Sequence, residues 1–583
     1  MDMMPPLNAS PEDSTPGHSN RLVDVALHHL RRQGITTIFG IPGGLIHPFF
    51  DRVEQDAEFS VVVARHEGGA AFMADGFART SGRIAVAAAT SGPGATNLLT
   101  GVAAAYADGV PMLVITGQAP SHTLGRGAAQ ETAREDIDIV GIFRPVTKYS
   151  AMVPSPQQFS LHFRRAITLA VNGRPGPVHL NVPVDFWQCL VDEPLADFTA
   201  VDSSRPVDLP AIEQAAALLA RAQHTVMLVG SGASSLGARR LVEEVATCLD
   251  APTATTPRAK GVFPEDHPLS LGVCGLAGSP AAQLALMEKS VDTLLVVGAS
   301  MNETTTFNWH PGIGHDRHII QLDIDPVRIG RNYPVDVALV GDAEATLAEL
   351  LKHLQAHTSS PRPAEAAIPG AGNILEMTKA PEVSPEKILG PDVWRAEFNC
   401  AIPSDAIVFS DIGGHMLFNL RHLCMRNGQR FILNMGFGSM GHGTVAPIGA
   451  SLGCPGTPII AIVGDACFAM NGMELLTARE YDIPVVWIVE NNQSHGISYH
   501  GSKLVNGGRA MQCIVNKKMV SAAAIAGAMG IPSWQVDQPG QIDQILNQAL
   551  AVSGPAVIEV HVDPEVSPPL AERARTVAGF RNN

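Results

Sequence analysis

The chain lacks the features that membranes and nucleic acids require of a protein. No run of about 18 or more uncharged apolar residues occurs in its 583 residues, so we expect no membrane-spanning segment. No long run of Lys or Arg occurs either, and 56 acidic against 40 basic side chains give a formal charge of −16. We therefore expect neither a nucleic-acid partner nor a polybasic membrane patch.

Paired cysteines and signal-peptide features are missing as well. The eight cysteines are scattered, with no C-x-x-C or other metal-binding spacing, which fits a reduced, cytoplasmic protein. Residues 1–20 are rich in Pro, Ser, Asn and Asp and have no basic start followed by an apolar stretch. We expect this segment to be a loose tail and not a signal peptide.

The composition that is present describes a large and well-buried protein. At roughly 100–200 residues per domain, the length predicts three or four domains. Apolar residues make up 45% and charged residues 16%, with 55 Gly and 43 Pro. These proportions are typical of a turn-rich globular protein and exclude a chain that is disordered throughout.

Short apolar, β-branched runs alternate with Ala-rich helical stretches from residue 21 onward. This repetition predicts an α/β protein whose parallel sheets are covered by helices on both faces. The expected strands are 38–40, 60–64, 84–88, 112–116, 177–182, 225–229, 293–297, 318–324, 406–409, 458–463, 485–490 and 556–562.

The strands group into three blocks, and we predict three doubly wound parallel-sheet domains. Their expected bounds are residues 21–190, 205–355 and 385–570. A Pro- and Gly-rich linker is expected at 356–384, and terminal tails at 1–20 and 571–583.

A candidate cation site ends two neighbouring strands of the third block. Gly464 and Asp465 follow one strand, Asn492 follows the next, and a helix is expected from about residue 472. Because open α/β sheets bind ligands at the carboxyl ends of their strands, these side chains should lie close together. Asp465, the Asn492 amide oxygen and the Ser494 carbonyl suit Mg²⁺, with phosphate oxygens and water as further ligands. Alternatively, Asp465 is a helix cap and Asn492 a turn residue.

Gly464-Asp465-Ala466 with Asn491-Asn492 resembles the G-D-G/A…N-N signature of thiamine-diphosphate (ThDP) enzymes. Over about residues 21–569 the chain is similar to the acetohydroxyacid (acetolactate) synthase branch of that superfamily. The segments that carry the resemblance are Phe39-Gly40-Ile41-Pro42-Gly43-Gly44, Arg65-His66-Glu67, Thr90 to Asn97, Ile115 to Gln118, Gly173 to Val178 and Asp323 to Pro326.

The resemblance implies a pyrimidine-binding domain, a middle domain and a diphosphate-binding domain, in that order. It implies a homodimer or homotetramer with each active site between the first domain of one subunit and the third of another. The implied reaction is decarboxylation of a 2-oxo acid donor, most simply pyruvate, and transfer of the acyl carbanion to a second carbonyl acceptor. The alternative within the same chemistry is a decarboxylase that releases an aldehyde.

Two residues carry most of the implied catalysis. Glu67 matches the glutamate that hydrogen-bonds the pyrimidine ring of ThDP, and burial should favour the proton that it shares with the ring nitrogen. Met440 matches the apolar residue that wedges beneath the two rings and brings the reacting atoms into a near-attack arrangement. Their alternatives are a Glu in the first turn of a helix and ordinary core packing.

The resemblance assigns further contacts. His415 in Gly413-Gly414-His415 matches a diphosphate-binding turn, although Gly414 departs from the usual Gln. Gln130 matches a Gln near the reacting carbon, and Lys148 matches a Lys of the substrate-access region; a solvated His, a surface Gln and a surface Lys are the alternatives. The remaining expected cofactor contacts are Pro42, Gly43, Gly44, Gly413, Gly438, Gly464, Ala466 and Gly496.

The sequence departs from the synthases at two places. After residues 293–297 both arginines of the family's flavin-binding run are missing, and the glycine-rich turn 230–237 is weak evidence alone, so FAD binding is possible but doubtful. Beyond Asn492 the chain has His495 and His500 and lacks the Trp of the synthases, and in the first block Ala129 stands where the synthases have a Phe. These departures predict a roomier, more polar acceptor pocket. His495 is a candidate proton donor or acceptor there, or a helix-edge His.

The sequence disfavours two other classes of protein. A non-catalytic paralogue is disfavoured because Glu67, Asp465, Asn492 and Met440 are all retained. An NAD-dependent dehydrogenase is disfavoured because no G-x-G-x-x-G occupies a first strand-to-helix turn with an acid about 20 residues on.

Overall fold

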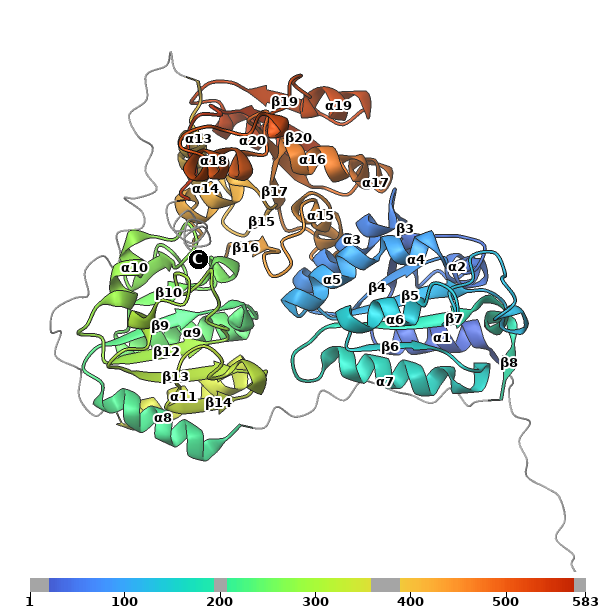
Figure 1. Cartoon of the computed structure of the whole chain (residues 1–583), viewed down its shortest axis with the longest axis horizontal. Helices are drawn as coiled ribbons and strands as arrows, with labels where there is room; N and C mark the ends of the chain where they lie inside the picture. The colour runs from blue at the N-terminus through green and yellow to red at the C-terminus, as the bar shows by residue number, and fades with distance from the viewer. Residues whose placement is uncertain (1–19, 193–206, 358–387, 571–583) are drawn as a thin grey trace, which may run out of the picture.

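The computed structural model describes residues 20–192, 207–357 and 388–570. Each predicted block forms a separate six-stranded parallel sheet with helices on its faces, which confirms the predicted fold class (Figure 1). The three sheets appear in Figure 1 as the blue, green and orange-to-red parts of the chain. A short antiparallel pair, β1 (Asn20–Arg21) with β8 (Leu190–Val191), joins the two ends of the first part.

The first and third sheets share one topology. The first has the order β3-β2-β4-β5-β7-β6, and the third has the equivalent order β16-β15-β17-β18-β20-β19. The strands are β2 (Thr37–Ile41), β3 (Ser60–Val63), β4 (Ala85–Ala89), β5 (Met112–Gln118), β6 (Tyr149–Met152), β7 (Pro177–Pro183), and β15 (Ile407–Ser410), β16 (Arg430–Leu433), β17 (Ile459–Gly464), β18 (Val486–Asn491), β19 (Ser533–Val536), β20 (Ala556–His561).

The middle sheet is ordered differently, β11-β10-β9-β12-β13-β14, which is the order of dinucleotide-binding folds. Its strands are β9 (Thr225–Val229), β10 (Thr253–Thr255), β11 (Ser270–Val273), β12 (Thr293–Val297), β13 (His318–Asp323) and β14 (Val337–Val340). In all three sheets the strand order reverses beside the first strand, and this reversal creates a crevice at the carboxyl ends of the strands.

Helices cover the sheets on both sides. Those of the first part are α1 (Leu22–Arg32), α2 (His47–Glu54), α3 (Glu67–Ser81), α4 (Pro93–Asn97), α5 (Leu99–Asp108), α6 (Ile139–Phe143) and α7 (Phe159–Val171). Those of the middle part are α8 (Leu209–Arg221), α9 (Leu236–Leu249), α10 (Pro280–Met287) and α11 (Ala343–His357). Those of the third part are α13 (Pro391–Ala401), α14 (Gly414–His422), α15 (His442–Gly453), α16 (Asp465–Asn471), α17 (Leu475–Glu480), α18 (Gly496–Val505), α19 (Ala522–Ala528) and α20 (Ile542–Leu550).

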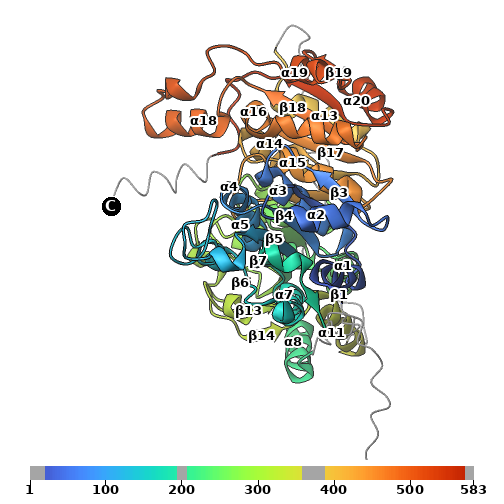
Figure 2. The ribbon, with the colours of Figure 1, turned by 90° about the vertical axis from the view of Figure 1, so that its right-hand side faces the viewer.

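Helices α3 and α15 join the first part to the third (Figure 2). Their backbones approach so closely that a Cβ on Gly76 would overlap the Ala446 carbonyl, and one on Gly449 would overlap the Met73 carbonyl. Between the two helices the buried Asp75 accepts hydrogen bonds from Arg79 and pairs with His442 at 2.6 Å. The two domains are therefore fixed against each other through glycines and one buried polar cluster.

The elements differ from expectation in three ways. All twelve expected strands are present, with ends that differ by one or two residues. Six short strands of the parallel sheets were missed, β6, β10, β11, β14, β16 and β19, as was the two-residue pair β1 and β8. The helix expected from residue 472 begins earlier, because α16 starts at Asp465 and a 3₁₀ turn, Gly472–Glu474, links it to α17.

The middle part extends to His357, where α11 ends; the linker beyond it and both predicted tails, except Asn20, lie outside the described residues. Within residues 20–192, 207–357 and 388–570, no helix combines the length and the apolar character that crossing a bilayer demands.

Candidate active site

A cavity of about 90 Å³ lies at the carboxyl ends of β15, β17 and β18. The register pairs Gly464 with Glu490, so the loops that follow β17 and β18 are direct neighbours. The cavity is lined by most of the predicted diphosphate-side residues: Gly413, His415, Met440, Gly464, Asp465, Ala466, Asn492, Ser494, His495 and Gly496. The structure thus brings together residues from four separate segments of the third domain.

Asp465 is the first residue of α16, and Gly464 is its N-cap. Burial raises the pKa of this carboxyl to about 7, and the Asn516 amide donates to it at 3.3 Å. No cation of the described chain pairs with Asp465, whereas its neighbour Glu490 is paired with Arg395 at 2.6 Å. A buried carboxylate of this kind suits a bound divalent cation.

The other two expected cation ligands follow β18. The Asn492 side-chain oxygen accepts from the Ser494 backbone N–H at 3.1 Å and from the Ser494 hydroxyl at 3.4 Å, and a bound cation would take the place of the longer bond. Gly496 is required because a Cβ there would lie 2.6 Å from the Asn492 amide nitrogen. One carboxylate, one amide oxygen and one carbonyl are hard oxygen ligands of the kind that Mg²⁺ prefers. Among the described residues no cluster of three or more His, Cys, Asp or Glu is found.

His415 contributes a ring nitrogen without a hydrogen-bond partner to the lining of the cavity. Its side chain is buried, and its Nε2 atom has no hydrogen-bond partner. Burial, followed by the charge of Arg395, lowers the pKa of His415 to about 3, so the ring is neutral. Gly413 and Gly464 leave the ring its space, because a Cβ on either would lie 2.8 Å from it. An unpartnered polar atom in this position fits a phosphate oxygen.

Met440 lies on a loop that is anchored at both ends. At one end Asp108 of the first domain accepts from Asn434 at 3.2 Å and from the Gly436 N–H at 3.1 Å. At the other end Gly441 donates to the buried carboxylate of Asp411 at 3.0 Å. Burial raises the pKa of Asp411. Neither acid was singled out from the sequence, although Asp411 directly follows a strand, as many ligand-site acids do.

The pyrimidine-side residues gather at the first sheet. Glu67 is the first residue of α3, and the Asn97 amide donates to its Oε2 at 2.9 Å. A Cβ on Gly94 would lie 3.4 Å from Glu67 Oε1, so this face of the carboxylate is close to bare backbone. Both predicted roles of Glu67, helix start and cofactor contact, are compatible with this position. The burial expected for Glu67 is only partial within one chain.

Glu474 of the third domain positions the Glu67 loop. Its buried carboxylate accepts from the backbone N–H groups of Arg65, at 3.0 Å, and His66, at 2.9 Å. Burial raises the pKa of Glu474. No local pattern predicts this contact, because 408 positions separate Glu474 from His66.

The remaining pyrimidine-side predictions have mixed placements. Gly43 lies against Thr90, where a Cβ would come within 2.6 Å, whereas Pro42 and Gly44 are exposed. Gln130 is exposed and lies over Gly92. Gly438 has φ +76°, and a side chain there would be strained.

Three predicted substrate residues are now placed. His495 lines the cavity. Lys148 donates to the carbonyls of Asn172 and Arg174 at 2.7 and 2.8 Å, so its ammonium holds a loop end. His500 is buried and hydrogen-bonds the Pro564 carbonyl at 3.0 Å, so it does not add polarity to the acceptor pocket, contrary to our expectation.

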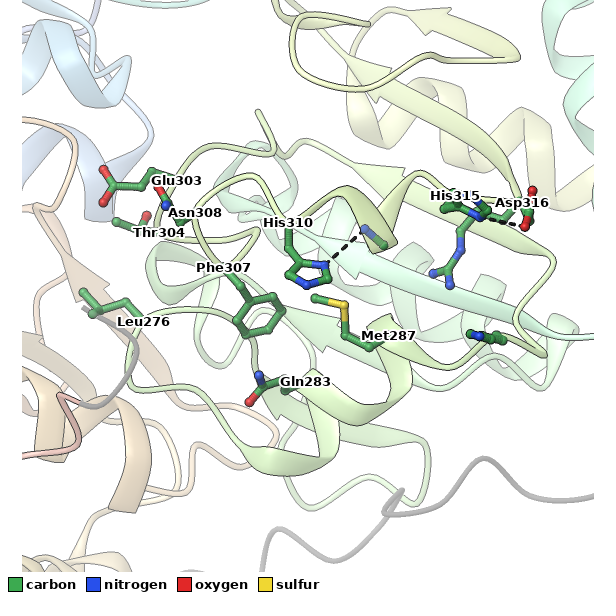
Figure 3. Close-up of a pocket in the computed structure, with 13 residues that line it drawn as sticks. Leu276, Gln283, Met287, Glu303, Thr304, Phe307, Asn308, His310, His315 and Asp316 are labelled. Atoms are coloured by element: carbon green, nitrogen blue, oxygen red, sulfur yellow. Dashed lines mark hydrogen bonds and ion pairs between the residues drawn. The ribbon is translucent and has the colours of Figure 1, made fainter. Parts of the chain in front are cut away.

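The glycine turn of the middle domain is engaged with its neighbouring loop. Gly230 and Gly232 donate to the carbonyls of Val297 and Gly298 at 2.8 and 3.0 Å, and Gly298 leaves no room for a side chain on Gly232. This turn therefore has a complete structural role without a nucleotide. A cavity of about 710 Å³ elsewhere in this domain contains Phe307, His310 and Met287 but none of the predicted site residues (Figure 3).

The diphosphate-side residues around Asp465 and the pyrimidine-side residues around Glu67, here called the two half-sites, define a class of protein. Residues 20–139 match the thiamine pyrophosphate enzyme N-terminal TPP binding domain, residues 212–350 the central domain, and residues 411–560 the C-terminal TPP binding domain. The chain therefore belongs to the thiamine pyrophosphate enzyme family.

Similar proteins narrow the relationship. The chain is 34% identical to the acetolactate synthase of Arthrospira platensis, covering 91% of this chain and 92% of that protein. It is 31% identical to the acetolactate synthase isozyme 2 large subunit of Escherichia coli K12, covering 92% and 94%. An X-ray structure of a protein from Mycobacterium smegmatis, assigned as a thiamin diphosphate-dependent enzyme, has a TM-score of 0.81 at 24% identity, covers 94% of this chain and all of that one, and supports the fold.

Proposed function

We propose that the chain is an acetolactate synthase-like carboligase that decarboxylates a 2-oxo acid, pyruvate in the first instance, and transfers the acyl group to a second carbonyl compound. The observation that carries this proposal is the similarity to acetolactate synthases over more than 90% of the chain, together with a pocket that combines Asp465, Asn492, His415 and Met440.

Each residue has a physical task in this proposal. Bound ThDP would supply the nucleophilic carbon and the electron sink. Asp465, Asn492 and the Ser494 carbonyl would hold Mg²⁺, while the His415 ring, whose Nε2 has no partner among the described residues, would contact a phosphate oxygen. Glu67 would hold a proton at the pyrimidine ring nitrogen, and Met440 would support the bent cofactor. His495 stands where it can exchange a proton with the acceptor carbonyl.

We also infer that the working site is shared between subunits. Glu67 does not line the cavity that contains Asp465 and Met440, and it is only half-buried. A second copy of the chain that placed its first domain over this cavity would complete both half-sites. A homodimer is the smallest assembly with this property.

The decisive experiment is product analysis. The purified protein, supplied with ThDP, Mg²⁺ and pyruvate, should give the ligated 2-hydroxy-2-methyl-3-oxo acid by mass spectrometry. Free acetaldehyde as the sole product would show that the reaction is simple decarboxylation and not carboligation. The absence of turnover on a panel of 2-oxo acids would refute the proposal. The visible spectrum of the same protein reports whether flavin is present.

A further inference from the structure

A second cleft, of about 580 Å³, lies where the three domains meet. It is bordered by the end of α3, the end of α5, the start of α9 and the edge strand β16. None of the predicted ThDP or Mg²⁺ contacts lines it. It shares Arg258 with a smaller cavity beside the Gly232 turn.

The cleft concentrates positive charge in an acidic protein. Five cationic side chains line it, namely Arg79, Arg239, Arg258, Lys260 and Arg430. Only two carboxylates do so, Asp108 and Glu344, although the whole chain has a formal charge of −16. The excess of positive charge is therefore local and is not a consequence of composition.

Three of the five cations have acidic partners. Asp108 pairs with Arg79 at 2.8 Å and with Arg258 at 3.0 Å. Lys260 forms a buried ion pair with Glu265 at 2.7 Å. The remaining lining carboxylate, Glu344, accepts from the Ser235 hydroxyl at 3.1 Å and lies against Gly237 at the start of α9.

Arg239 and Arg430 have no carboxylate partner among the described residues. Arg239 donates from Nη2 to the carbonyls of Gly261 and Gln429, and Arg430 donates from Nη2 to the Arg79 carbonyl at 2.8 Å. These bonds use only part of the five N–H donors that each guanidinium carries. Burial, with the charge of Arg430 next, lowers the pKa of Arg239 to about 10, as expected for a cation that lacks a counter-ion.

We propose that the cleft binds a phosphate group, free or as an ester, between Arg239 and Arg430. Two guanidinium forks that face one cleft match the geometry of a tetrahedral oxyanion, whereas a single carboxylate would leave donors unused. Because the cleft is lined by all three domains, the bound anion also favours their assembled arrangement.

The test uses the holoenzyme, loaded with ThDP and Mg²⁺ and freed of excess cofactor, so that the predicted diphosphate site is filled. Inorganic phosphate, methyl phosphate and succinate are titrated by calorimetry at constant ionic strength. We expect one saturable site per chain for the two phosphates, and weaker binding by at least about tenfold in the Arg239→Gln/Arg430→Gln double variant. Turnover of pyruvate should be unchanged.

Two control variants distinguish phosphate binding at this site from nonspecific attraction to positive charge. Arg240→Gln removes the same charge from the next position of α9, where the side chain is 73% exposed and faces Glu244, and should bind phosphate normally. Arg328→Gln alters the neighbouring cavity and should also leave binding intact. If the double variant fails to fold, Arg239→Lys, which keeps the charge but loses the fork, should weaken binding on its own.

Several outcomes would overturn the proposal. They are the absence of saturable phosphate binding, equal weakening in Arg240→Gln, loss in Arg328→Gln alone, unchanged affinity in Arg239→Lys when the double variant does not fold, and succinate binding as tight as phosphate. A chain that binds phosphate here but produces no acetolactate would leave this site standing and refute the proposed reaction, so the two proposals fail separately.

Discussion

The orientation of Glu67 depends on neighbouring residues that are distant in the sequence. The motif predicts the residue, and its place at the start of α3 follows from the local sequence. Its orientation depends on Asn97, 30 positions away, and on Glu474 of another domain. Local sequence patterns cannot predict such contacts, because these contacts exist only after the sheets have formed and α3 has packed against α15.

Replacing Glu67 by Gln tests its proton chemistry. The amide keeps the shape and can still contact Asn97 but cannot exchange a proton with the pyrimidine ring, so turnover should fall by roughly 10²-fold or more. The exposed Glu54→Gln is the matched control and should be fully active. Turnover and circular dichroism are measured together; near-normal turnover of Glu67→Gln would remove its assigned role.

Asp465 is the central ligand of the proposed Mg²⁺ site. Asp465→Ala removes the only carboxylate of the proposed Mg²⁺ set, so ThDP should be lost when the protein is separated from free cofactor by gel filtration. Asp405→Ala, an exposed substitution in the same domain, should keep the cofactor. Retention of a full complement of ThDP by Asp465→Ala would contradict the proposed site.

His179 links stability to pH. It is buried between the hydroxyls of Thr116 and Ser150, at 2.8 and 2.9 Å, and burial lowers its pKa to about 3. The unfolded chain, with a His pKa of about 6.5, binds a proton that the folded chain excludes. This contribution to stability is complete above pH 6.5 and is lost as the pH falls toward 3. In urea unfolding at pH 7 and pH 5, His179→Gln should lose less stability than the wild type on acidification; an unchanged difference would exclude His179 as a source.

At the scale of elements, prediction succeeded where a signal was long and uniform. Strands such as β12 and β17 are largely apolar, β-branched runs, and all twelve segments predicted as strands are strands. The missed strands of the parallel sheets have three or four residues, and β10 reads Thr-Ala-Thr, which has no alternation or apolar run. Edge strands such as β16 and β19 owe their conformation to one neighbouring strand, which the local sequence cannot specify.

At the α3–α15 crossing, a Gly-to-Ala substitution should change stability in the opposite direction from the same substitution in an open helix. Ala normally stabilises a helix relative to Gly by up to about 1 kcal/mol. Gly449→Ala should instead destabilise by about 1–3 kcal/mol, because its Cβ would overlap the Met73 carbonyl and force the helices apart. Gly527→Ala in α19, where the nearest atom would lie 3.8 Å away, is the control and should be neutral or stabilising. Thermal unfolding of both variants checks this, and equal melting temperatures would contradict the close crossing.

At the scale of the whole molecule, the two groups of predicted site residues lie apart within one chain. Within one chain the first and third domains meet through α3 and α15, and Glu474 ties the Glu67 loop to the third domain (Figure 2). That contact leaves Glu67 outside the cavity of Asp465 and Met440. In the proposed dimer, twofold symmetry would pair the first domain of each copy with the third domain of the other.

Mixing two inactive variants tests this arrangement directly. In a heterodimer of Glu67→Gln and Asp465→Ala subunits, one site holds both substitutions and the other holds neither, if each site takes Glu67 from one subunit and Asp465 from the other. After complete subunit exchange half of the dimers are mixed, so activity should recover to about a quarter of the wild-type value. A chain with Glu67 and Asp465 in one site of its own would recover nothing, because every site would keep one substitution. Mixing Glu67→Gln with Glu54→Gln sets the scale, since it leaves half of all sites intact under either arrangement.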